Sequence, residues 1–127
     1  MSRKFFFFRT LLILSFLVPF QSCDKDYNEI IPDVPVTFNI NLNIANELTV
    51  PGNSVLFPYE GYGGVIVYCE MPGSYYAFDA ACTLEISRSC IVQNDGDLAT
   101  CPCCDSQFIL FGGAYPSKGP ATLPLKQ

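Results

Sequence analysis

The chain has 127 residues, half of them hydrophobic, a formal net charge of −5, and seven cysteines but no histidine. This length allows one domain at most. Without histidine there is no Ser-His or Cys-His nucleophile pair, and an acidic chain without a basic patch is not suited to bind nucleic acid. The cysteines are therefore the residues that carry most information about function.

Residues 1–22 have the organisation of a secretory signal peptide. Basic side chains within residues 1–9 precede an apolar stretch at 10–20, and Gln21-Ser22-Cys23 follows. Eleven apolar residues are too few for a transmembrane helix. A cysteine directly after the cleavage position resembles a bacterial lipoprotein signal, in which that cysteine is acylated. The alternative is an ordinary cleaved signal that ends beside a free cysteine.

Acylation of Cys23 predicts an exported protein that is lipid-anchored in the bacterial cell envelope. Residues 23–33 would be an acylated cysteine and a polar tether, and residues 34–127 the folded domain. The acidic residues after Cys23 resemble surface-export signals of some Gram-negative lipoproteins and favour the outer membrane. In residues 23–127, twelve acidic side chains oppose four basic ones, so the mature side-chain charge is −8. The expected partners are the lipid membrane and a redox or structural protein of the envelope.

Residues 34–44 alternate strictly between apolar and polar side chains. This period of two predicts a strand with one buried face. Pro35 lacks an N–H, which predicts an edge position at the start of that strand. The apolar side is made by six residues: Val34, Val36, Phe38, Ile40, Leu42 and Ile44.

Short apolar and β-branched runs follow, separated by Gly, Pro and Asn turn residues. They predict strands at 55–57, 65–68, 75–79, 91–92 and 108–111, the last before a tail rich in Gly and Pro. The second and third runs flank a turn at 71–74 and should pair as a hairpin. Asp95-Gly96 favours a tight hairpin turn. No stretch has a sustained helical period, so the sequence predicts an all-β sandwich or small barrel.

Five of the seven cysteines lie within residues 81–108. Cys82-Thr83-Leu84 is followed by sixteen residues and then by Cys101-Pro102-Cys103-Cys104. This spacing resembles that of the Rieske iron–sulfur domains, which carry Cys-x-His and Cys-x-x-His on two loops. Pro102, Cys103 and Ser106 match residues that support the second loop in that family.

The resemblance extends to other parts of residues 34–127. Phe78-Asp79 resembles the strand that leads into the first loop, and Phe108 matches an aromatic position after the second. Gly119-Pro120-Ala121 with Pro124-Leu125 resembles the family's tail. The resemblance implies a small Rieske-like antiparallel sandwich or barrel with two cysteine loops at one tip.

The chain departs from the family where the metal ligands are. Leu84 stands at the first histidine position and has no donor atom, whereas Cys104 stands at the second and can still bind a metal. Asp105 replaces a glycine that helps the family's loop to fold tightly. Because the family's outer iron needs two histidines, a standard Rieske cluster is excluded.

Two metal-bound alternatives remain. In one, Cys82, Cys101 and Cys104 with a fourth thiolate hold a 2Fe–2S cluster or a single iron, and the protein is a low-potential electron carrier. In the other, the same residues hold a structural zinc. Cys90 is the tentative fourth ligand, because Cys103 is too close to Cys104 for unstrained joint ligation. The resemblance implies an electron-transfer component at most, and no other enzyme signature is present.

A third alternative is that the cysteines form disulfides, which persist in exported proteins. The resemblance implies that Cys103 bonds a cysteine five positions after the first ligand, but Ser87 occupies that position. Cys90, three residues further on, is expected to substitute. A bridge from Cys82 to Cys101 or Cys104 would then join the loops, in a domain without cofactor that serves structure or binding. Cys69 lies in a predicted strand and is expected to be a small buried residue or a disulfide partner.

Overall fold

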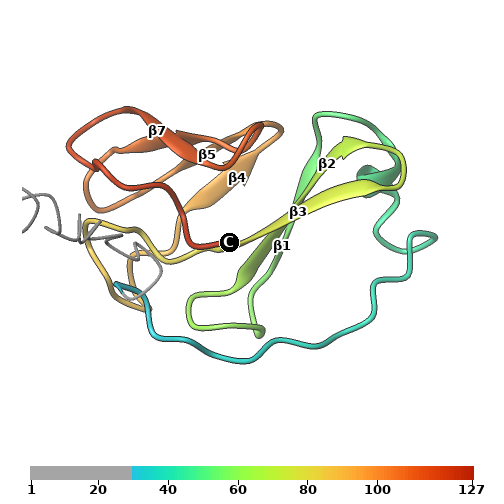
Figure 1. The fold of residues 1–127 in the computed structure, drawn as a ribbon, viewed down its shortest axis with the longest axis horizontal. Coiled ribbons are helices and arrows are strands. Elements are labelled where there is room, and N and C mark those ends of the chain that lie inside the picture. Colours follow the sequence, from blue (N-terminus) through green and yellow to red (C-terminus); the bar gives the residue numbers. More distant parts are fainter. Residues whose placement is uncertain (1–29) are drawn as a thin grey trace, which may run out of the picture.

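The first sheet is built around a hairpin of β2 (Val65–Met71) and β3 (Ser74–Asp79). In the computed structural model, which describes residues 30–127, β1 (Ser54–Phe57) pairs antiparallel with the other side of β2, giving the order β1-β2-β3. Figure 1 shows this sheet beside a second one that holds the later strands. The predicted strands at 55–57, 65–68 and 75–79 and the hairpin turn between the last two are confirmed.

The second sheet is a four-stranded antiparallel meander. It contains β4 (Gln93–Asp95), β5 (Leu98–Thr100), β6 (Gln107–Ile109) and β7 (Tyr115–Lys118), in chain order. The tight turn between β4 and β5 is confirmed, with Gly96 at φ +59°, a backbone conformation that glycine adopts at little steric cost. The all-β fold class is therefore confirmed, as two antiparallel sheets.

Alternation along β2 places apolar side chains on both faces of the first sheet. Val65, Val67 and Cys69 point to one face, and Ile66 and Tyr68 to the other, because successive strand residues face opposite ways. All five residues are buried. The second of these faces joins the larger core, which includes Phe78, Cys82, Val92, Ala99, Cys101, Phe108 and Leu110. Both cysteine loops thus rest on the larger core.

The predicted strand at 34–44 is wrong: this segment, here called the cover segment, forms no strand. It is extended up to Asn41 and reaches the 3₁₀ helix η2 (Asn46–Thr49), and in Figure 1 it runs below the first sheet. The carbonyl of Asn41 accepts hydrogen bonds from Ile44 and Ala45 N–H, both 2.9 Å long. Its side-chain Oδ1 accepts one from Asn43 N–H. Such local bonds compete with a strand ladder.

Apolar side chains of the cover segment nevertheless reach the sheet. Phe38 and Ile40 pack against the smaller core, made by Leu48, Val65, Val67 and Cys69, and the Phe38 and Phe57 rings lie 5.1 Å apart. At the other extreme, Ile44 is 81% exposed. Val34, Val36 and Leu42 are exposed as well, so the predicted buried face is wrong except at Phe38 and Ile40, which are partly buried.

Strand β7 lies in the tail that was predicted to have no strand. It pairs with β6, with a shift of register between Gln107 and Phe108, and contains Pro116. Proline is tolerated there because β7 is at the edge of the sheet, where one side needs no hydrogen-bond donor. The predicted strand at 91–92 is also displaced, since β4 begins at Gln93 and residues 81 and 91 make an isolated bridge.

The predicted signal peptide and most of the predicted tether, including Cys23, lie outside the described residues. Within residues 30–127, the structure holds no helix with the length and apolar character needed to cross a membrane.

Candidate metal centre

The first cysteine loop leaves β3 and returns towards β4, and its base is held by backbone pairing. Val92 N–H donates to the Ala80 carbonyl at 2.8 Å, and Cys82 N–H donates to the Cys90 carbonyl at 3.3 Å. Residues 80–92 thus form a narrow loop whose two sides run antiparallel. Cys82 sits inside this loop with no exposed surface, because it belongs to the larger core.

Asp79, the last residue of β3, ties the first loop to a glycine turn. Its carboxylate accepts hydrogen bonds from the backbone N–H groups of Tyr62 at 2.8 Å, Gly63 at 3.1 Å and Ala81 at 2.9 Å. A Cβ on Gly63 would lie 2.7 Å from Ala81 N, so only glycine allows the turn to approach this closely. The sequence analysis missed this role of Asp79, although an acid at a strand end and a nearby run of glycines are its two signals.

The second cysteine loop connects β5 to β6 in a tight turn. Cys101 N–H donates to the Ser106 carbonyl at 2.8 Å, and Asp105 N–H donates to the Cys101 carbonyl at 3.0 Å. Asp105 has φ +58°, in the left-handed region that glycine favours and that Asp tolerates better than most residues. The resemblance predicted a position where glycine is usual, and the angle found here is one that glycine adopts readily.

The tail packs beneath the second loop and fixes Ser106, which is fully buried. Ala121 N–H donates to Ser106 Oγ at 3.0 Å, and a Cβ on Gly119 would lie 2.6 Å from Ser106 Cα. The tail also reaches the first loop, where Thr83 Oγ1 donates to the Leu123 carbonyl at 2.8 Å. The tail therefore contacts both loops: Gly119 and Ala121, which belong to the resemblance, support the second loop, and the Leu123 carbonyl contacts the first.

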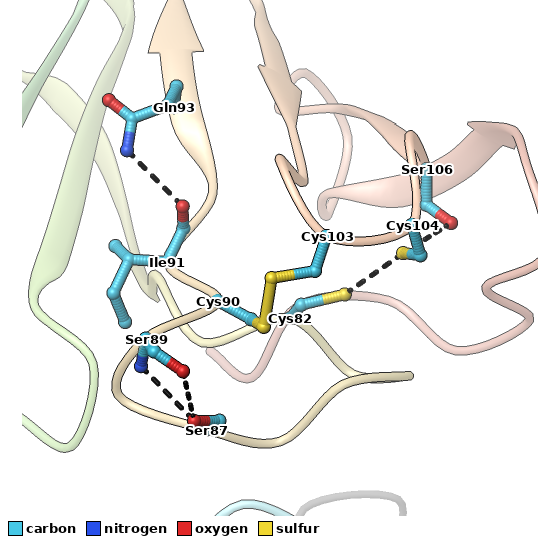
Figure 2. Close-up of a disulfide and its surroundings, with 9 residues drawn as sticks. All are labelled: Cys82, Ser87, Ser89, Cys90, Ile91, Gln93, Cys103, Cys104 and Ser106. Carbon is cyan, nitrogen blue, oxygen red and sulfur yellow. Dashed lines mark hydrogen bonds between the residues drawn. A yellow bond between two sulfur atoms is a disulfide. The ribbon is translucent and has the colours of Figure 1, made fainter.

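A disulfide between Cys90 and Cys103 joins the two loops, with a Cα–Cα distance of 5.7 Å (Figure 2). This is the pairing that the resemblance implied once Cys90 replaced Ser87 as the partner. It has a consequence for the metal alternatives, because a sulfur in a disulfide is not a thiolate ligand. Neither Cys90 nor Cys103 is thus available as a fourth ligand in this structure, and the tentative assignment of Cys90 to that position is corrected.

The remaining three cysteines of the loops converge. The sulfur atoms of Cys82, Cys101 and Cys104 all lie within 4.8 Å of one another, and those of Cys82 and Cys104 are 3.6 Å apart (Figure 2). With Zn–S bonds of about 2.3 Å, two thiolates on one tetrahedral zinc ion lie about 3.8 Å apart. The observed spacing of the sulfurs therefore fits three ligands of one metal ion.

The sulfurs of Cys82 and Cys104 differ in their surroundings. Burial raises the pKa of the Cys82 thiol. Burial also raises that of Cys104, but hydrogen bonds, chiefly with Ser106, outweigh it and leave the pKa of Cys104 below its usual value. Cys104 Sγ donates to Ser106 Oγ at 3.2 Å, and Ala121 N–H donates to the same oxygen. When Cys104 is ionised, the Ser106 hydroxyl can donate to its thiolate instead.

An iron–sulfur cluster fits these residues less well. A 2Fe–2S centre needs four protein ligands shared between two irons, and the described residues bring only three free thiols together here. Leu84, at the first histidine position, has a side chain without a donor and is 45% exposed. Moreover, ligands of two different irons lie farther apart than ligands of one ion. The three-sulfur arrangement does not fit a cluster with four protein ligands.

Other residues singled out in the sequence lie away from the sulfurs or support them. Pro102 is exposed in the second loop. Cys69 is a free, fully buried cysteine in the smaller core, as expected for a packing residue.

Neither known protein families nor curated proteins include a match to this chain. A solved structure described as "Complex of reduced oxygenase and oxidized ferredoxin in carbazole 1,9a-dioxygenase" is similar, at 28% sequence identity. The match covers 60% of this chain and 76% of that chain, with a TM-score of 0.40.

Proposed function

We propose that this chain is an envelope lipoprotein with a degenerate Rieske-like domain, in which a single thiolate-bound metal ion takes the place of the iron–sulfur cluster. Cys82, Cys101 and Cys104 would hold the ion. The observation that carries the proposal is the convergence of these three sulfurs, from two loops, within 4.8 Å.

Zinc is the metal that best fits these ligands. Thiolates bind soft or borderline ions, and zinc accepts tetrahedral sulfur sites without demanding a geometry of its own. Zinc has no redox chemistry, so a bound ion would fix the two loops relative to each other and would not carry electrons. Three thiolates leave one position of a tetrahedral ion for a ligand that is not one of these cysteines.

The Rieske-like part of the proposal is supported by the placement of the loops. The two motifs that resemble the family in sequence lie next to each other in space, and a disulfide links them. The tail segment that resembles the family packs against the second loop. Leu84 and the bonded Cys90 explain why a cluster would be lost while the loops keep their arrangement.

Metal content tests this function directly. We expect zinc-supplied protein, purified without oxygen, to contain about one zinc per chain and no acid-labile sulfide. Cys101→Ala should abolish binding. Cys69→Ala is the matched control, because Cys69 is equally buried but belongs to the other core, and it should bind zinc like the wild type.

Two results would contradict the single-ion site. Iron and sulfide in equal amounts would indicate a low-potential cluster and an electron carrier instead. Protein that binds neither metal would indicate loops held by disulfides alone.

The membrane anchor is a separate part of the proposal, supported by the sequence of residues 1–23. Cys23→Ser should move the protein from the membrane fraction to the soluble fraction and remove the mass of the acyl chains. Equal membrane association of both variants would show that the anchor is elsewhere.

A further inference from the structure

The three thiols of the site are not equivalent. The Cys82 and Cys104 sulfurs lie 3.6 Å apart (Figure 2), and the Cys101 sulfur lies within 4.8 Å of both. Cys82 and Cys101 have no exposed surface, whereas Cys104 is half-buried. A reagent in solution therefore reaches the site through Cys104, and the Cys82 sulfur lies 3.6 Å from the Cys104 sulfur.

The neighbouring disulfide already holds this pair in place. Cys103 precedes Cys104 in the second loop, and its partner Cys90 accepts a hydrogen bond from Cys82 N–H in the first. A bond between Cys82 and Cys104 would bring two sulfurs from 3.6 Å to about 2.05 Å. The loops need not approach from a distance, since the existing disulfide has closed that gap.

We propose that Cys82 and Cys104 form a reversible disulfide that releases the metal, so that the metal-bound form and the disulfide form are two states of one site. This inference rests on the proposed function. The bond would remove two of the three ligands at once and leave Cys101 alone, which cannot hold the ion by itself. The site would thus bind metal under reducing conditions and lose it under oxidising ones.

The oxidant is an external disulfide, either a small molecule or a thiol–disulfide exchange protein of the envelope. The Cys104 thiolate attacks one sulfur of that disulfide, which breaks its S–S bond and expels a first thiolate. The Cys82 thiolate then attacks Cys104 Sγ in the mixed disulfide and expels the second. The two cysteines together lose two electrons, the external disulfide is reduced to two thiols that take two protons from water, and the metal ion leaves.

Zinc-loaded wild-type protein treated with oxidised glutathione tests the inference. We expect release of one equivalent of zinc, measured with a chelating dye, and a peptide pair linked through Cys82 and Cys104 in mass spectra. Dithiothreitol followed by zinc should restore the metal-bound form. Zinc that stays bound would overturn the inference, as would zinc release without the Cys82–Cys104 link.

Variants separate this inference from the proposed function. Cys104→Ala should form no such link, and Cys69→Ala should behave as the wild type. Cys101→Ala should fail to bind zinc yet still form the Cys82–Cys104 bond, because that pair is intact. Wild-type protein that binds no zinc would overturn the metal site, while the presence or absence of the same linked peptide would still decide whether the pair is redox-active.

Discussion

Asp105 lies in the second cysteine loop at a position where the resemblance predicted glycine. Its φ is +58°, an angle that glycine adopts readily. What the sequence could not show is that the aspartate still adopts this conformation. The loop therefore forms with an aspartate at this position.

Substitution at Asp105 should follow this backbone requirement. Asp105→Val should destabilise the protein by about 1–2 kcal/mol, because the left-handed conformation brings the Cβ of a β-branched residue too close to the following carbonyl oxygen. Asp105→Gly should change the free energy of unfolding by less than about 1 kcal/mol. Urea denaturation measures both. Equal effects of Val and Gly would show that the angle does not control stability here.

Asp79 is a residue whose role could not be predicted from its neighbours in the chain. Its carboxylate accepts hydrogen bonds from the N–H groups of residues 62, 63 and 81. Residues 62 and 63 come close to Asp79 only when the β2–β3 hairpin forms. Asp79→Ala should cost about 2–3 kcal/mol, since a charged acceptor is lost and N–H groups are left without it. Thermal and urea unfolding measure this cost.

The control for Asp79 is Glu85, an acid in the first cysteine loop whose side chain is exposed. Glu85→Gln should leave unfolding unchanged within about 0.5 kcal/mol. If Asp79→Ala were as mild, the first loop would be positioned by its backbone pairing and not by the carboxylate.

At the scale of elements, the sequence predicted the strands that carry an apolar or β-branched run and missed β7, which carries none. The β2–β3 and β4–β5 hairpins follow from their turn residues. Strand β7 was missed because its four residues, Tyr-Pro-Ser-Lys, have no alternation of apolar side chains. The cover segment was assigned as a strand because alternation is the same for a paired strand and for an unpaired chain lying on a sheet.

Two alanine substitutions in the cover segment distinguish a side chain that packs on the sheet from one that does not. Phe38→Ala should destabilise the protein by about 1–3 kcal/mol, because Phe38 is half-buried against Phe57 and the smaller core, and full burial would give more. Ile44→Ala should have almost no effect, since Ile44 is 81% exposed. Urea denaturation compares them. Similar losses for both residues would instead support a paired strand with a uniformly buried side.

At the scale of the whole molecule, the cysteine arrangement was only partly predictable. Motif spacing and the resemblance together predicted that the two cysteine loops lie next to each other, and they do so in the structure. The number of free thiols at the tip depends on which cysteines pair, and that depends on loop geometry. Once Cys90 and Cys103 are bonded, three thiols remain there and the four-ligand alternatives lose a donor.

The Cys90–Cys103 disulfide should contribute strongly to stability. It spans thirteen residues of sequence, and closing a loop of this size stabilises the folded state by about 3 kcal/mol through the unfolded chain. The double variant Cys90→Ala/Cys103→Ala should lose about that amount in urea unfolding. A loss below about 1 kcal/mol would mean that the tail and backbone pairing already hold the loops together.

Strand β2 is covered on both faces and flanked by a strand on each side. Its amide protons should therefore be among the slowest to exchange with deuterium, because they open only when the molecule unfolds as a whole. A change that makes global unfolding rarer would then slow deuterium exchange of the β2 amides, which lie between the two cores. A bond or ion that stabilises the two cysteine loops would thus also slow exchange of amides on the far side of the first sheet. This effect needs no displacement of the atoms between, because both regions unfold together.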